Sequence, residues 1–151
     1  MIVANNTRIA KLAEYLLSII DEITNEITPL INADWLSNDI NNYSLDRIPT
    51  ARQVRKWITG TTICKDTYNF RSRMSYSSDR INNLKNIGFF ERFEEIVADN
   101  NRKGVLPEID GIQSIKCLNS GTLNNTTSNT AEFNIQIQIE YIEKLNKEVS
   151  L

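Results

Sequence analysis

The strictest alternation of hydrophobic and polar residues lies between Ala131 and Leu145, in the sequence AEFNIQIQIEYIEKL. Apolar side chains take every second position, namely Phe133, Ile135, Ile137, Ile139 and Tyr141. A period of two predicts a β-strand with one face on a core and the other in water. The polar positions between them are Asn134, Gln136, Gln138 and Glu140. Amides outnumber charges there, whereas strand surfaces more often carry Lys, Glu or Thr, so this polar face needs an explanation.

Two other regions show the helical spacing of apolar residues. Between positions 9 and 27 they recur at intervals of three and four, which predicts an amphipathic helix. Asn6 or Thr7 can cap its start, and Pro29 must end it because the ring breaks a helical hydrogen bond. A second amphipathic helix is expected over about 78–102.

Shorter segments read as strands. The segment 43–50 ends in Pro49, which cannot donate to a ladder, so it is expected at a sheet edge. A long hairpin is predicted over 52–76 and a further strand over about 112–118, whose facing parity is ambiguous. The entirely polar segment 119–131 is expected to be a loop, longer than a tight hairpin needs.

The second arm of the predicted hairpin also has two different faces. One parity is mostly apolar, with Asp66 and Ser72 interrupting Cys64, Tyr68, Phe70 and Met74. The other parity is basic and polar, and consists of Lys65, Thr67, Asn69, Arg71 and Arg73. This arm is therefore predicted to be half-buried, with a basic exposed face.

The element order is helix, strand, hairpin, helix, strand, strand. It predicts the α+β class, with a mostly antiparallel β-sheet and two amphipathic helices packed on one face. A chain of 151 residues is enough for one domain, and no internal repeat is visible, so residues 1–151 are expected to form a single domain.

Composition removes several classes of function. The net charge of −2 argues against a general nucleic-acid binder, since phosphates require a basic excess on at least one face. The sequence has no His, which excludes Ser–His and Cys–His nucleophiles and most zinc and iron sites. Cys64 and Cys117 stand far apart and are expected to be reduced and packed as small hydrophobes. No catalytic, cofactor or metal residue is predicted, and no membrane span or signal peptide is visible, so synthesis in the cytoplasm is expected.

Three stretches resemble a family of small tailed-bacteriophage proteins often labelled minor capsid or minor tail proteins, namely the tail terminators. They are NNYSLDRIPT at 41–50, LKNIGFFERFEEIVADNNRKGVLPEIDG at 84–111, and IKCLNSGTL at 115–123 followed by AEFNIQIQIEY at 131–141. The similarity spans about residues 40–142. Its motifs are structural rather than chemical, and the segments 51–60 and 124–129 look divergent.

The resemblance implies a ring of about six subunits that caps the head-proximal end of the tail tube. Such a ring ends tube polymerisation and joins the tail to the neck, with an added sheath contact if the tail is contractile. The implied location is the virion, after assembly in the host cytoplasm. The implied partners are further copies of the chain, the tail tube protein and a neck protein, with DNA only in transit and no membrane.

Within such a ring, three sets of residues become candidate sites. The hairpin offers an open strand edge to a neighbouring subunit, and its candidate interface residues are Trp57, Lys65, Arg71 and Arg73. A wall of amides allows DNA to pass without binding its phosphates, so the channel-facing candidates are Asn134, Gln136, Gln138 and Glu140. The basic face of the hairpin is then expected to point elsewhere. The candidate tube-contact residues in the polar loop are Thr122, Asn124, Asn125 and Thr127.

Each of these assignments has a competing interpretation. The chain is alternatively another phage neck or tail-completion protein, such as a head-closure protein, or else a generic adaptor or an enzyme. The strand edge is alternatively only a protected edge, and the polar loop an excursion into solvent. The amide face is alternatively an ordinary solvated surface, or buried against the next subunit.

Overall fold

The computed structural model describes residues 7–24, 32–33, 42–49, 53–56, 60–75, 80–119, 121–126 and 130–144. Two helices are present among them, α1 (Arg8–Thr24) and α2 (Arg80–Lys103). The strands of the described part are β1 (Asn32–Ala33), β2 (Asn42–Ile48), β3 (Gln53–Lys56), β4 (Thr61–Ser75), β5 (Ile112–Cys117), β6 (Thr122–Thr126) and β7 (Thr130–Lys144).

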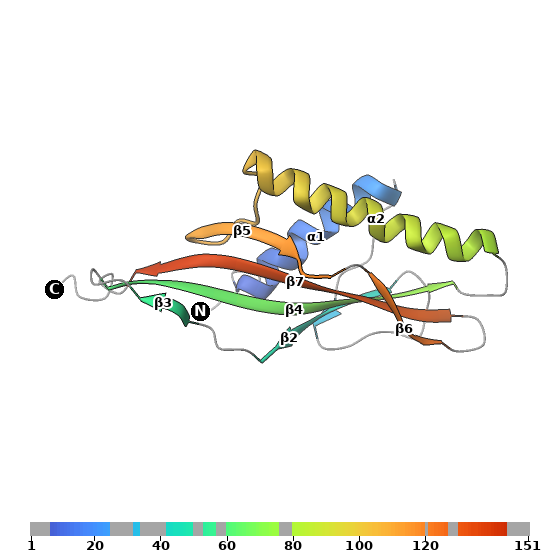
Figure 1. The fold of residues 1–151 in the computed structure, drawn as a ribbon, viewed down its shortest axis with the longest axis horizontal. Helices are drawn as coiled ribbons and strands as arrows, with labels where there is room; N and C mark the ends of the chain where they lie inside the picture. Colours follow the sequence, from blue (N-terminus) through green and yellow to red (C-terminus); the bar gives the residue numbers. More distant parts are fainter. Residues whose placement is uncertain are drawn as a thin grey trace.

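One sheet contains all of these strands, with β4 and β7 at its centre (Figure 1). The two central strands pair antiparallel over their whole length, from Thr61 opposite Lys144 to Ser75 opposite Thr130. On the outer side of β4 lie β2 and β3, and on the outer side of β7 lie β5 and β6. Only the short β1 pairs parallel, with β2. The predicted mostly antiparallel sheet is therefore confirmed.

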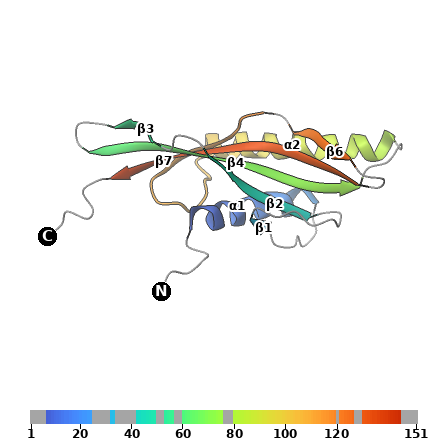
Figure 2. The same ribbon diagram turned by 90° about the horizontal axis from the view of Figure 1, so that it is seen from below.

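Both helices cover the same face of the sheet, as the α+β prediction requires (Figure 2). The buried stripe of α1 consists of Leu12, Leu16, Ile19 and Ile20. The apolar positions of β7 are buried on this side, with Ile135, Ile137 and Ile139 fully covered. The alternation in the sequence thus reports the face that the helices occupy.

Aromatic rings connect α2 to three strands. Phe93 of α2 stacks on Phe70 of β4 with ring centroids 5.3 Å apart, and Phe70 stacks in turn on Tyr43 of β2 at 5.7 Å. Phe90 packs against Phe133 of β7 at 5.4 Å. Aromatic pairs at these separations stabilise a core beyond the area they bury. The GFF-containing stretch of α2 is therefore the part that fixes the helix to the sheet.

Local chemistry sets where the helices begin and end. The hydroxyl of Thr7 accepts a hydrogen bond from the N–H of Ala10 at 3.2 Å, which caps α1 as the sequence predicts for Asn6 or Thr7. After α2, Gly104 adopts a φ of 78°, the left-handed conformation in which helices commonly end.

Two expectations about loops and strands need correction or completion. The segment 119–131 is not simply a loop, because Thr122–Thr126 form β6 and pair with β7. The register of β6 shifts between Leu123 and Asn125, which interrupts its alternation and hides the strand from a search for period two. In β5, a similar shift between Ile112 and Ser114 puts Ile112 on the helix side together with Ile115 and Cys117, whereas Leu118 is exposed.

Both cysteines are free, as expected for small packed hydrophobes. Burial raises the pKa of the Cys117 thiol to about 12, and the carboxylate of Glu94 adds to the effect. A thiol with such a pKa is a poor nucleophile at neutral pH. Within the described residues, no helix combines the length and apolar composition that crossing a membrane requires.

Candidate functional site: the polar face of the sheet

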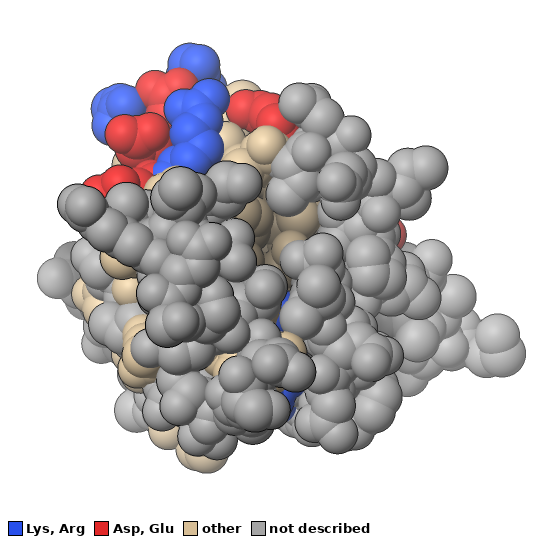
Figure 3. Space-filling model, turned by 90° about the vertical axis from the view of Figure 1, so that its right-hand side faces the viewer, with Lys and Arg blue, Asp and Glu red and all other residues tan. Residues whose placement is uncertain are grey.

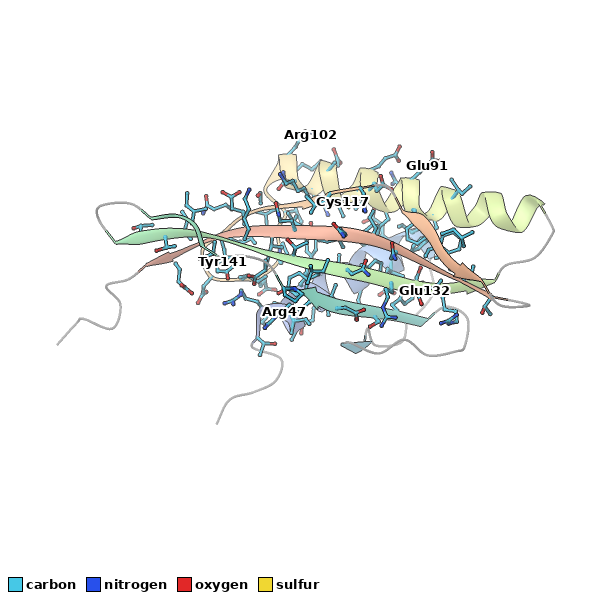
Figure 4. All side chains as sticks on the ribbon, turned by 60° about the horizontal axis from the view of Figure 1, so that its bottom comes forward. Arg47, Glu91, Arg102, Cys117, Glu132 and Tyr141 are labelled. Carbon is cyan, nitrogen blue, oxygen red and sulfur yellow. The ribbon has the colours of Figure 1, made fainter. Side chains whose placement is uncertain are left out.

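The face of the sheet opposite the helices is polar along both central strands (Figure 4). In an antiparallel pair, residues directly opposite one another point to the same face. Near one end of this face lies an apolar pair, Ile63–Ile142. The polar facing pairs on this side are Lys65–Glu140, Thr67–Gln138, Asn69–Gln136, Arg71–Asn134 and Arg73–Glu132. We call this set of ten residues the polar face.

This register overturns one expectation from the sequence. The basic residues Lys65, Arg71 and Arg73 were expected to point away from the amides of β7. They lie instead directly opposite Glu140, Asn134 and Glu132 on the same face. The period of two fixes which residues of one strand share a face, but only pairing between strands decides which two faces coincide.

The centre of the polar face is neutral. Asn69 and Gln136 lie opposite each other, and the amide of Gln138 donates to the hydroxyl of Thr67 at 3.4 Å. Thr67 is buried, whereas Asn69, Gln136 and Gln138 are half-exposed. Neutral amides carry no charge to pair with a phosphate, so this part of the face has little affinity for phosphates.

One end of the polar face carries a network of ion pairs. The guanidinium of Arg71 lies 2.5 Å from Asp46 of β2 and 3.7 Å from Glu132 of β7. Arg73 lies 3.8 Å from the same Glu132 carboxylate, and Ser44 donates to Asp46 at 2.7 Å. Arg73 and Glu132 are 9% and 8% exposed, so their charges are withdrawn from solvent. Buried ion pairs of this kind specify an arrangement more than they add stability.

The other end is less buried. Lys65 and Glu140 lie opposite each other and are half-exposed, and Lys116 of β5 is exposed on the same side, opposite Gln138. Among the residues whose side chains are described, four cations and three anions lie on this side of the sheet. The cations are Lys65, Arg71, Arg73 and Lys116, and the anions are Asp46, Glu132 and Glu140.

The structure places the remaining candidate residues in two groups. Thr122, Asn124 and Asn125 belong to β6, where Thr122 lies opposite Asn134. Trp57 and Thr127 lie outside the described residues. The described members of the hairpin set, Lys65, Arg71 and Arg73, meet the amide set on one face, while β6 adjoins it at the end of β7.

A second polar cluster lies on the opposite, helix-facing side of the sheet. In the sequence it shows only as Asp66, which interrupts the apolar positions of β4. Asp66 accepts hydrogen bonds from Arg8 of α1 at 2.9 Å, Tyr141 of β7 at 3.1 Å and Tyr68 at 3.4 Å. The guanidinium of Arg8 also lies 4.7 Å above the Tyr141 ring. We call these four residues the Asp66 cluster.

The Asp66 cluster borders an open cleft of about 1130 Å³. The cleft is lined by cations and anions together, namely Arg8, Lys11, Arg47, Glu108, Asp110 and Glu143. Burial raises the pKa of the Tyr68 phenol to about 12, with the Asp66 charge as the next cause. The Asp66 carboxylate accepts hydrogen bonds from both phenols and from the Arg8 guanidinium. The cluster therefore holds α1 on the sheet and presents no free reactive group.

Among the described residues, no three His, Cys, Asp or Glu side chains are arranged to hold a metal ion. No protein-family model matches the chain, and no curated protein matches it at a significant level.

Proposed function

We propose that the chain is a structural protein of a tailed bacteriophage and assembles into a ring of about six copies. The ring caps the head-proximal end of the tail tube, ends its polymerisation and joins it to the neck. Its partners are the tail tube protein and a neck protein, and it belongs to the virion. The chain performs no catalysis in this proposal.

The observation that carries the proposal is the polar face. A ring through which DNA passes requires a wall that is wetted but does not retain phosphates. The polar face offers neutral amides at its centre and cations that already have anions beside them. Cations that are already paired with carboxylates release fewer counterions on contact with DNA, and counterion release is the main driving force for DNA binding. We therefore assign this face to the bore.

The fold supports the same proposal. The resemblance implies a mostly antiparallel sheet with helices to one side, and the described elements have that arrangement. This agreement is partly independent of the resemblance, because the helices and strands follow from periodicity alone.

The first test is the oligomeric state. Purified protein is examined by native mass spectrometry and negative-stain microscopy, and a ring-shaped particle of about six copies is expected. A protein that remains monomeric up to high concentration contradicts the proposal. A ring that joins the head but fails to end tube growth favours the neck or head-closure role instead.

The second test concerns the bore. The double variant Gln136→Lys, Gln138→Lys adds two cations per subunit to the neutral centre of the polar face. Particles with this ring are expected to eject DNA several-fold more slowly at low salt, and the difference should shrink as salt rises. The matched control is Ala98→Lys, Val105→Lys, which adds the same charge at exposed positions on and after α2. Equal ejection rates for both variants at low salt contradict the bore assignment, and failed ring assembly of the first variant alone places the face in a subunit interface.

A further inference from the structure

The β7 side of the sheet shows how this protein protects a strand edge. The N–H of Ile115 in β5 donates to the side chain of Asn101 on α2 at 3.0 Å. In the gap between β5 and β6, the N–H of Gln136 donates to the side chain of Asn119 at 2.8 Å. The N–H of Gly121 donates to Glu94 of α2 at 3.1 Å. Side chains therefore satisfy these backbone groups where no further strand follows among the described residues.

Strand β6 differs from this pattern. Within the described part of the chain, it pairs with β7 on one side and with no strand on the other. Its Leu123 is 49% exposed and lies opposite Phe133. Phe133 packs on Phe90 of α2, and one turn earlier on that helix Ile87 is 52% exposed. An open edge beside exposed apolar side chains has the properties of a site that accepts an added strand.

The helix surface beside β6 is acidic. Glu91 and Glu95 of α2 are exposed, and Glu94 accepts a hydrogen bond from the N–H of Gly121, the residue that precedes β6. Arg92 is the cation of this turn, and it already lies 3.6 Å from Glu95 and 3.9 Å from Glu22 of α1. Figure 3 shows that both basic and acidic side chains gather at the top of the molecule, where α2 lies.

The opposite edge of the sheet carries an exposed cation. Strand β1 pairs only with Ser44 and Leu45 of β2, which leaves Asp46–Ile48 without a described strand on that side. Arg47 is exposed there, and the cleft beside it is lined by Arg8 and Lys11 as well as by Glu108, Asp110 and Glu143. Figure 4 places Arg47 and Glu91 on opposite sides of the molecule. Among its described residues, one subunit therefore presents an edge beside an acidic turn and an edge with an exposed arginine, and the two face away from each other.

We propose that β6 of one subunit pairs with the Asp46–Ile48 edge of β2 in a second copy of the chain. This inference rests on the proposed ring and names its subunit contact. Main-chain hydrogen bonds between the two edges supply affinity, while Arg47 of one copy meets the acidic turn around Glu91 of the next. The contact is head-to-tail, since each subunit uses two different patches, and such contacts close into rings.

The charges disfavour a symmetric contact through β6, because a contact of β6 with β6 brings two acidic turns of α2 together. Like charges directly across an interface oppose association. Nucleic acid is disfavoured at β6 for the same reason, because the acidic turn repels phosphates.

The first experiment introduces a charge at the β6 edge. Leu123→Asp is expected to weaken association roughly tenfold or more, measured by mass photometry over a dilution series. The matched control is Val105→Asp, at a position 51% exposed in the loop after α2, and it should leave association unchanged. Ile87→Asp serves as a second variant should Leu123→Asp fail to fold, because it charges the same apolar site from the helix.

The second experiment exchanges charges across the contact. Arg47→Glu and Glu91→Arg are each expected to weaken association about tenfold, and the double variant to recover to within about threefold of the wild type. If the wild type forms rings and both Leu123→Asp and Arg47→Glu associate as strongly as the wild type, this contact is wrong, while the proposed ring stands. A double variant that shows the summed loss of the two single ones also overturns it. A wild-type chain that never associates overturns the ring itself.

Discussion

Replacing Asp66 with Ala should destabilise the protein more than the loss of an ordinary surface acid. Its side chain is 12% exposed and accepts hydrogen bonds from Arg8, Tyr141 and Tyr68. Hydrogen bonds to a charged group contribute about 1.5–3 kcal/mol each when buried, and the half-exposed Arg8 pair contributes at most about 1 kcal/mol. The variant also leaves two phenols without their acceptor, although water from the cleft can replace part of it. The expected loss is about 3 kcal/mol.

Urea unfolding followed by circular dichroism measures this loss. Arg8→Ala should cost about 1 kcal/mol, because Asp66 keeps both phenols. Asp110→Ala removes an exposed acid from the same cleft and should change stability by less than about 0.5 kcal/mol. A cost for Asp66→Ala no greater than that of Asp110→Ala would refute the view that the Asp66 cluster fastens α1 to the sheet.

Three further outcomes follow from the geometry. The folded state holds the Tyr68 phenol neutral with a pKa of about 12, above its ordinary value of 10.0. The phenol's contribution to the free energy of unfolding is therefore complete below pH 10 and is lost as pH rises toward 12, a loss of roughly 2–3 kcal/mol in all. Tyr68→Phe should lack that alkaline decline in urea unfolding from about pH 9 to about pH 11.5, and an identical decline in both proteins would contradict the assignment. Glu132→Ala should lower the free energy of unfolding by about 3 kcal/mol, because it leaves the nearly buried cations Arg71 and Arg73 without the carboxylate between them. The control Glu140→Ala, on the same face but half-exposed, should lower it by less than about 1 kcal/mol, and equal losses would contradict this prediction. Gly111→Ala should lower stability by roughly 2–4 kcal/mol in thermal unfolding, since the φ of Gly111 is 76° and an added Cβ meets the Ile142 carbonyl. Gly104 has a similar φ of 78°, but nothing lies within contact of an added Cβ, so Gly104→Ala should lower stability by only about 1 kcal/mol.

Periodicity predicts those elements of the fold whose sequence carries a regular pattern. The strict alternation of β7 and the spacing in α1 each report a single buried face, and the structure confirms both. Strand β6 was missed because it is short, almost uniformly polar and interrupted by a register shift. Its formation depends on pairing with β7, a contact between chain segments that no local pattern records.

The candidate site shows the same division between local and long-range information. The sequence predicts that Lys65, Arg71 and Arg73 share a face, and that Gln136 and Gln138 share a face. That these two faces are one depends on the register between β4 and β7. Asp66 is a feature of the sequence that already indicates a long-range contact. A charged residue at an apolar position of a strand requires a partner, and here the partner comes from α1, 58 positions away in the sequence.

The two proposals constrain each other through the position of the helices. If subunits join through β6 and β2, their sheets meet edge to edge and the helices lie on one side of the joined sheets. Both helices project from one face of the sheet, so closing the ring toward that side would press α1 of one copy against α2 of the next. Closing toward the polar face moves the helices apart and meets only side chains. The edge contact therefore directs the polar face toward the bore. A ring whose density shows the helices nearest its axis would contradict the contact and the bore assignment together.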